Sequence, residues 1–113
     1  ILIDDSIVRG TTSDRIVRML REAGAKQVHM RVSSPPFLWP CYFGTDVPAR
    51  EQLIAYNRSI EEIRRVIGAD SLAYLRTERL SEMAGGRGIC TGCFTGSYPM
   101  NPPREDIRGE YDR

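Results

Sequence analysis

Two adjacent carboxylates, Asp4 and Asp5, follow directly on the apolar run of residues 1–3. Open α/β sheets bind ligands at the carboxyl ends of their strands, so a strand over residues 1–3 would place both carboxylates at such a position. Carboxylates repel phosphate, and their oxygens suit a sugar diol or a Mg²⁺ ion held near it. The pair therefore indicates a site for a polar, oxygen-rich ligand.

A small loop that contains hydroxyl groups follows the acidic pair and leads into a helical pattern. Backbone N–H groups and the dipole at a helix N-terminus favour phosphate, and Gly10 lets the backbone approach it closely. Thr11 and Thr12 add hydroxyl donors, and Arg9 would point either at a pyrophosphate or out to solvent. The plainer interpretation is a solvated, Asp-rich turn before a capped helix. A Walker loop and a dinucleotide-binding glycine motif are both absent from the sequence.

Three cysteines form a second candidate site. Cys90 and Cys93 are a C-x-x-C pair, and Cys41 lies far upstream. So few cysteines, in an odd number, do not suit the disulfide scaffold of a secreted protein. The close pair indicates ligation of a metal or cluster, or redox chemistry, in a reducing compartment. The alternatives are a zinc site that uses His29 as well, a redox pair like that of thioredoxin, which the late position of Cys90 disfavours, and three unrelated buried thiols.

Elements that could position these residues alternate between strand and helix. Residues 1–3 are wholly apolar, as in a parallel strand covered on both faces. Thr12 or Ser13 can cap a helix that Gly24 ends. We further expect a strand over 28–32, a loop over 37–47, a short helix over 51–56, a helix over 59–67, a strand over 71–75 and a helix over 77–83 capped by Thr77. The helix over 59–67 would begin with the capping box Ser59-x-x-Glu62, and its buried side would consist of Ile60, Ile63, Val66 and Ile67. This alternation predicts βαβ units and an α/β fold with a parallel sheet. Asp70 is expected only to end a helix, and the polar tail beyond Pro99 to be frayed.

Composition excludes several classes of function. The formal net charge of +1 gives no reason to expect nucleic acid or an anionic membrane as a partner. No apolar run approaches the roughly 20 residues that span a bilayer, and the early charges at Asp4, Asp5 and Arg9 do not suit a signal peptide. We expect a cytoplasmic protein. Because the sequence has no initiator Met and starts inside a strand pattern, we expect it to be part of a longer chain.

Residues 1–13 resemble the phosphoribosyl pyrophosphate signature of type I phosphoribosyltransferases, in which apolar residues, an acidic pair and a Gly/Thr loop follow one another. The sequence is most similar to the amidophosphoribosyltransferase family, through residues 21–25, 33–36, 53–55, 67–70 and 93–96 as well, so that the match reaches about residue 99. This resemblance implies the C-terminal portion of a type I phosphoribosyltransferase fold, with 1–83 in the phosphoribosyltransferase domain and 84–113 as a cysteine-containing segment and polar tail. Thr45 departs from the family pattern, which has an aliphatic residue there. We expect that change to affect local packing and to matter little for activity.

The resemblance implies that this segment binds phosphoribosyl pyrophosphate. Asp4 and Asp5 would bind the ribose hydroxyls and help to hold Mg²⁺, and Ser6 would also bind the substrate. The substrate's 5′-phosphate would lie against Val8, Arg9, Gly10, Thr11 and Thr12. The family replaces the pyrophosphate with ammonia, drawn from glutamine in a separate N-terminal domain, and so makes 5-phosphoribosylamine in the first committed step of purine biosynthesis. Purine nucleotides inhibit the family, partly by occupying the same loop, and a homo-oligomer is expected. These 113 residues hold none of the glutaminase groups and are expected to be inactive alone.

One branch of the family carries a [4Fe–4S] cluster, and Cys41, Cys90 and Cys93 match that branch. Such a cluster normally takes four thiolates, so the resemblance implies a fourth ligand outside these residues. The cluster would have a structural role, tying the C-terminal segment to the loop at Cys41.

Two other functions compete with this one. The first is a salvage base phosphoribosyltransferase on the same fold, which the cysteines and the long C-terminal match disfavour. The second is a non-catalytic regulator that senses phosphoribosyl pyrophosphate. The upstream sequence would separate them, because a domain with an N-terminal nucleophilic Cys indicates the amidotransferase and a helix-turn-helix domain indicates the regulator.

Overall fold

The computed structural model describes residues 1–47 and 49–102. Strands and helices alternate along them, as expected of an α/β protein: β1 (Leu2–Asp4), α1 (Thr11–Glu22), β2 (His29–Val32), the 3₁₀ helix η1 (Arg50–Gln52), α2 (Ile60–Ile67), β3 (Ser71–Tyr74), α3 (Thr77–Met83) and α4 (Gly92–Thr95). None of the described helices is long and apolar enough to cross a membrane.

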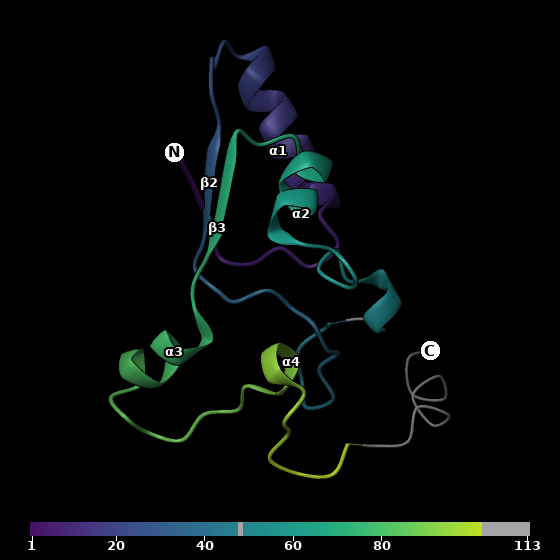
Figure 1. Cartoon of the computed structure of the whole chain (residues 1–113), viewed down its shortest axis with the longest axis vertical. Coiled ribbons are helices and arrows are strands. Elements are labelled where there is room, and N and C mark those ends of the chain that lie inside the picture. Colours follow the sequence, from purple (N-terminus) through teal and green to yellow (C-terminus); the bar gives the residue numbers. More distant parts are fainter. Residues whose placement is uncertain (48, 103–113) are drawn as a thin grey trace.

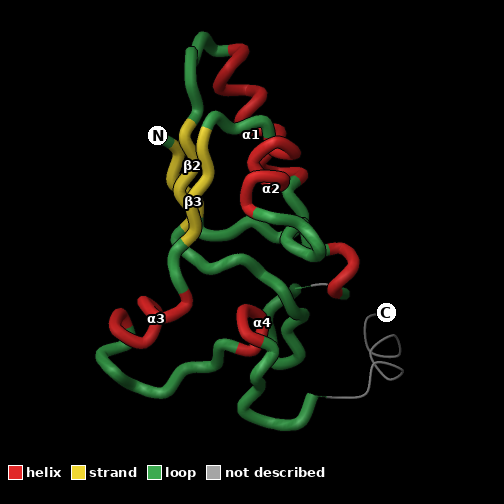
Figure 2. Tube along the Cα trace, in the orientation of Figure 1, coloured by secondary structure: helices red, strands yellow, loops and turns green. Residues whose placement is uncertain are grey.

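The three strands form one parallel sheet in the order β1-β2-β3. On the central strand, Met30 lies beside Leu2 and Leu72, and Val32 lies beside Asp4 and Tyr74. Helices α1 and α2 lie on the same side of this sheet (Figures 1 and 2). The predicted parallel sheet is therefore confirmed.

The core lies between the sheet and the two helices. Ile63 and Ile67, one turn apart on α2, are 1% and 0% exposed and pack with the equally buried Met30 of β2. Ser59 caps α2, accepting the Glu62 backbone N–H at 3.1 Å, so the predicted capping box is confirmed at its N-cap bond. Ile60 and Val66, also expected to be buried, are 46% and 53% exposed, because an eight-residue helix buries only one stripe of its surface.

The other face of the sheet is open within the described residues. Ile1 and Ile3 are 91% and 74% exposed, and Arg31 and Ala73 are exposed as well. The expectation that residues 1–3 are covered on both faces is thus wrong for this part of the chain. Strand β1 is an edge strand, and both neighbouring helices lie on the opposite side.

The N-cap of helix α1 lies two or three residues before the predicted caps. Its N-cap is Gly10, whose φ of 85° is left-handed, and no side chain caps the helix. Thr12 lies in the first turn and Ser13 is buried there, so neither is the cap. The predicted end is confirmed: the helix stops at Glu22, and Gly24 follows with a φ of 104°.

The remaining predictions hold with two exceptions. Segments 28–32, 71–75 and 77–83 contain β2, β3 and α3, and no helix or strand is found in 37–47. Thr77 is the first residue of α3, and Arg76 is its N-cap. The helix expected over 51–56 is confined to η1, because Leu53, Ile54 and Ala55 are all buried and three consecutive residues cannot share one face of a helix. Residues 103–113 of the predicted frayed tail lie outside the described residues.

Candidate functional site

The acidic pair lies where β1 ends. Asp4 is the last residue of the strand, and its Oδ1 accepts the backbone N–H of Asp5 at 2.8 Å. The Asp5 carboxylate accepts the Ser6 hydroxyl at 3.3 Å. Within residues 1–47 and 49–102 neither carboxylate forms an ion pair, so their remaining lone pairs can accept hydroxyl groups or bind a cation.

Residues 5–10 form a loop that passes beneath the carboxyl ends of the strands toward α1 (Figure 1). Ile7 anchors this loop in the core and is 2% exposed. The carbonyl of Val8 accepts the backbone N–H of Ile54 at 2.9 Å. A Cβ on Gly10 would overlap the Cδ1 methyl of Ile54, so only glycine fits at this approach. Packing thus fixes the loop from its inner side.

The loop leads into the N-terminus of α1, which no side chain caps. The backbone N–H groups of the first helical residues, Thr11, Thr12 and Ser13, have no acceptor inside the helix, and the N-cap Gly10 offers no side chain. Thr11 and Thr12 are exposed, with their hydroxyls at the same end of the helix. Together with the positive end of the helix dipole, this arrangement suits an anion such as phosphate.

Arg9 is bound on the flank of the loop. Its Nη2 donates to Oε1 of Gln52 at 3.2 Å. Neither of the two predicted orientations, toward a pyrophosphate or freely into solvent, includes this contact. Because Gln52 is neutral, this contact does not place a negative charge beside the Arg9 guanidinium.

The two cysteine-bearing segments are packed against each other. The carbonyl of Cys93 accepts the backbone N–H groups of Leu38 and Trp39, each at 3.0 Å. The rings of Phe37 and Phe94 lie 5.1 Å apart, and the Tyr98 hydroxyl donates to the Pro40 carbonyl at 2.7 Å. These contacts hold α4 against the loop that carries Cys41.

None of the three cysteines forms a disulfide among residues 1–47 and 49–102. Burial and, to a smaller extent, the nearby Cys41 and Cys90 together raise the pKa of the Cys93 thiol to about 11. At Cys41, burial acts to raise the pKa, but hydrogen bonds from the backbone N–H groups of Phe43, Thr45 and Gly44 and from the Thr45 hydroxyl outweigh it, so the pKa is lowered. The aliphatic residue of the family pattern could not supply that hydroxyl.

The described residues give no support to a zinc site that includes His29. No three His, Cys, Asp or Glu side chains among residues 1–47 and 49–102 are grouped so that they could hold a metal ion. Both ring nitrogens of His29 are already used, at 2.7 Å from the Ser71 hydroxyl and 3.1 Å from Oε1 of Gln27.

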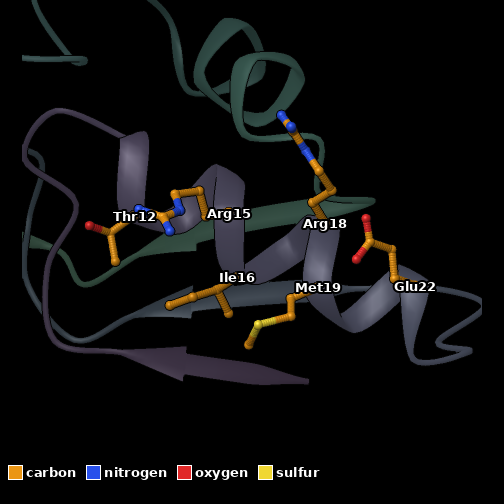
Figure 3. A pocket seen from close by; sticks show the side chains of 6 residues that line it. All are labelled: Thr12, Arg15, Ile16, Arg18, Met19 and Glu22. Carbon is orange, nitrogen blue, oxygen red and sulfur yellow. The ribbon is translucent and has the colours of Figure 1, made fainter.

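A shallow depression runs along α1 and is lined by Thr12, Arg15, Ile16, Arg18, Met19 and Glu22 (Figure 3). Ile16 and Met19 point to the side of α1 on which β1 is seen, and Arg18 extends the other way. Met19 is 63% exposed. Apart from Thr12, this depression contains none of the predicted site residues.

Two contributions were missed by sequence reasoning. Ile54 and Gln52 support the loop of residues 5–10, and their sequence signal is the apolar run of residues 53–55 that follows the polar pair of residues 51 and 52. Asp70 was expected only to end a helix, and that is wrong. Its Oδ2 accepts the Val28 backbone N–H at 2.7 Å and the Arg21 guanidinium at 2.9 Å, and these bonds lower the pKa of its carboxyl. Asp70 therefore joins the start of β2 to the end of α1.

No protein-family model matches the chain. The chain is 57% identical to the amidophosphoribosyltransferase of Archaeoglobus fulgidus over 110 residues, which cover 94% of this chain and 24% of the relative. It is 52% identical to the chloroplastic amidophosphoribosyltransferase 2 of Arabidopsis thaliana over 110 residues, 96% of this chain and 20% of the relative. The enzyme of Bacillus subtilis is 53% identical over 105 residues. The chain therefore spans about a quarter of the length of the curated relatives it matches, or less.

Solved structures give the same result. The glutamine phosphoribosylpyrophosphate amidotransferase of B. subtilis, complexed with ADP and GMP, superposes with a TM-score of 0.81 at 50% identity, covering 91% of this chain and 24% of that one. A structure described as the allosteric regulatory enzyme of purine biosynthesis gives a TM-score of 0.82, also at 50% identity, with 91% and 23% covered. Over most of its length, then, this chain resembles one part of an amidophosphoribosyltransferase.

Proposed function

We propose that this chain is part of an amidophosphoribosyltransferase and carries the phosphoribosyl pyrophosphate site of that enzyme. The full protein would transfer ammonia, released from glutamine elsewhere in the polypeptide, to phosphoribosyl pyrophosphate and so make 5-phosphoribosylamine. The observation that carries the proposal is the arrangement at residues 4–13, where two unpaired carboxylates precede a loop that ends in an open helix N-terminus. The identity to amidophosphoribosyltransferases favours this function over a salvage transferase or a regulator.

Each part of the site has a separate task. The free N–H groups of the first turn of α1 and the hydroxyls of Thr11 and Thr12 would bind the three charged oxygens of the 5′-phosphate. Asp4 and Asp5, at the end of β1, would accept the two ribose hydroxyls. With both ends of the ribose phosphate held, the anomeric carbon has one orientation toward the ammonia. The carboxylates would also stabilise the positive charge that develops on the ribose ring.

Mg²⁺ fits the oxygen-rich donor set of the acidic pair. Asp4 and Asp5 would help to hold it, and its chemistry would be to neutralise the departing pyrophosphate. Because Asp4 already accepts the Asp5 N–H with one oxygen, its other oxygen is the one left for a diol or a metal.

We propose that the three cysteines hold a [4Fe–4S] cluster. What supports this is that the segments carrying Cys41 and Cys93 are packed against each other, and that Cys41 and Cys90 both raise the pKa of the Cys93 thiol, as nearby thiols would. Cys41, Cys90 and Cys93 would hold it with a fourth ligand from another part of the protein, and we place the protein in the cytoplasm, where thiols are kept reduced.

We further propose that residues 1–83 belong to the phosphoribosyltransferase domain and 84–113 to a cysteine-bearing segment. The rest of the domain would cover the open sheet face at Ile3 and the depression beside Met19. A homo-oligomer and inhibition by purine nucleotides at the phosphate loop complete the proposal. The B. subtilis relative was crystallised with ADP and GMP, which supports nucleotide binding.

The full-length Asp4→Asn/Asp5→Asn variant tests the transferase function. Asparagine keeps the size of each side chain but removes the charge. We expect ammonia-dependent synthesis of 5-phosphoribosylamine to be abolished, while hydrolysis of glutamine is retained at least in part. Asp14→Asn is the control: it removes the same charge from the first turn of α1, where Asp14 is paired with Arg18 at 2.9 Å. Undiminished synthesis by the double variant would refute the assignment.

Anaerobic purification of the full-length protein tests the cluster. We expect brown protein with about four iron atoms per chain, as a [4Fe–4S] cluster requires. Cys90→Ser should lose the iron and the visible absorbance. Colourless, iron-free wild-type protein would contradict the cluster without touching the transferase proposal.

A further inference from the structure

We propose that Arg50 is a positioning residue for the phosphate loop and couples that loop to the cysteine-bearing segment. The inference rests on the proposed function, since it concerns how residues 8–12 are held for phosphoribosyl pyrophosphate. Its observations are separate, however, because none of the contacts below involves the acidic pair.

The first contacts join α4 to the loop before Cys41. The Cys93 carbonyl binds the N–H groups of Leu38 and Trp39. At the end of α4, a Cβ added to Gly96 would lie 2.7 Å from Cε2 of Trp39, so the indole packs directly on this glycine. The position of Trp39 is therefore set by α4.

Arg50 packs against Trp39 and is held there. Its guanidinium carbon lies 3.7 Å from the ring centroid of Trp39, and its Nε donates to the Leu38 carbonyl at 2.9 Å. The guanidinium carbon also lies 5.1 Å from the ring centroid of Tyr56. A flat, charged group held by two rings and a directed hydrogen bond has little freedom, and a lysine ammonium cannot reproduce this set of contacts.

The last contacts pass from η1 to the phosphate loop. Arg50 opens η1, and its carbonyl accepts the Leu53 N–H at 3.1 Å. Within the next few residues Gln52 binds Arg9, and Ile54 binds Val8 and packs on Gly10. Three contacts of the loop thus depend on a short segment whose first residue is fixed by Trp39.

This arrangement has a consequence for substrate binding. If α4 or the loop at Trp39 shifts, Arg50 and η1 shift with it, and the phosphate loop loses its inner support. The cysteine-bearing segment would then affect the affinity for phosphoribosyl pyrophosphate without contacting it. Such coupling is established by non-additive effects of substitutions at its two ends.

The experiment uses the full-length protein with ammonia as nitrogen donor, so that the glutaminase reaction does not contribute. We expect Arg50→Ala to raise the KM for phosphoribosyl pyrophosphate by roughly tenfold while kcat changes by less than about twofold, and Arg50→Lys to give an intermediate increase. Arg79→Ala and Arg79→Lys are matched controls on α3, where Arg79 is bound to Glu82, and should leave KM unchanged. Gly96→Ala, which displaces Trp39, should raise the KM when it is the only substitution. Combined with Arg50→Ala, it should raise the KM little beyond the value of Arg50→Ala.

An unchanged KM in folded Arg50→Ala would overturn the inference, as would fully additive effects of Arg50→Ala and Gly96→Ala. If Arg50→Ala does not fold, Arg50→Lys decides in the same way. Failure of the proposed function looks different, since the Asp4→Asn/Asp5→Asn variant would then synthesise 5-phosphoribosylamine normally.

Discussion

Ile54 occupies the space that a side chain on Gly10 would need, and its backbone N–H binds the carbonyl of Val8 two residues earlier in the loop. A hydrophobic residue more than forty positions downstream therefore determines that residue 10 is glycine. The left-handed φ of 85° at Gly10 adds a second, independent reason.

Gly10→Ala should consequently damage both stability and substrate binding. The positive φ and the overlap with Ile54 together should cost about 2–4 kcal/mol, and relief of the overlap would move the loop and raise the KM for phosphoribosyl pyrophosphate. Gly24→Ala is the control: its φ of 104° is also left-handed, but nothing lies within 4 Å of the added Cβ. It should lower the thermal midpoint modestly and leave KM unchanged. Equal KM values for both variants would contradict a role for the close approach.

Asp70→Asn should make the stability of the folded state depend less on pH in the acidic range. The Val28 N–H and then Arg21 lower the pKa of the Asp70 carboxyl, so its charged form stabilises the folded state above the unfolded pKa of about 3.9. That contribution is lost as pH falls through the lower, folded pKa. We expect the variant to melt below wild type at pH 7 and the difference to shrink below about pH 4. A constant difference over this range, measured by calorimetry, would show that charge at Asp70 is irrelevant.

Ser59→Ala should remove the N-cap of α2. The Ser59 hydroxyl accepts the Glu62 N–H, and loss of such a cap costs about 1 kcal/mol. Ser81→Ala is the matched control, because Ser81 is exposed within α3 and is expected to change stability by no more than about 0.5 kcal/mol. Ser59→Asp should restore most of the loss. A cap role would be excluded if Ser59 and Ser81 variants had the same thermal midpoint.

Tyr74→Phe should reveal whether another part of the protein reaches β3. The Tyr74 hydroxyl is buried without a hydrogen-bond partner among residues 1–47 and 49–102, and burial raises its pKa to about 12. An unpaired buried hydroxyl is unfavourable, so its removal should be neutral or stabilising by up to about 1 kcal/mol in the full-length protein. Destabilisation by more than about 1 kcal/mol would instead indicate an acceptor supplied from outside these residues.

The order of elements was predictable because each has its own local pattern. Alternation at Val28, Met30 and Val32 predicted β2, and the capping box of Ser59 and Glu62 marked the start of α2. The same local rules misplaced the start of α1, since Thr12 and Ser13 are better caps than Gly10 by residue type. Gly10 ends the loop because of Ile54, a contact across the fold that no local pattern contains.

The residues of the candidate site could be predicted from the sequence, but the residues that hold them in place could not. Residues 4–13 are contiguous, so a motif could identify them. Gln52, Ile54 and Asp70 act through distant partners, and a helix was predicted where Leu53, Ile54 and Ala55 are buried together. Those three residues are buried by tertiary packing, which overrode the helical propensity of the segment.

The open side of β1 has a practical consequence for anyone who expresses these 113 residues alone. Unpaired backbone groups along β1, next to the exposed Ile1 and Ile3, present a template on which another copy can add its own edge strand. Self-association into aggregates is then the expected behaviour of the isolated segment, and a charged substitution such as Ile3→Lys is the simplest way to keep it in solution.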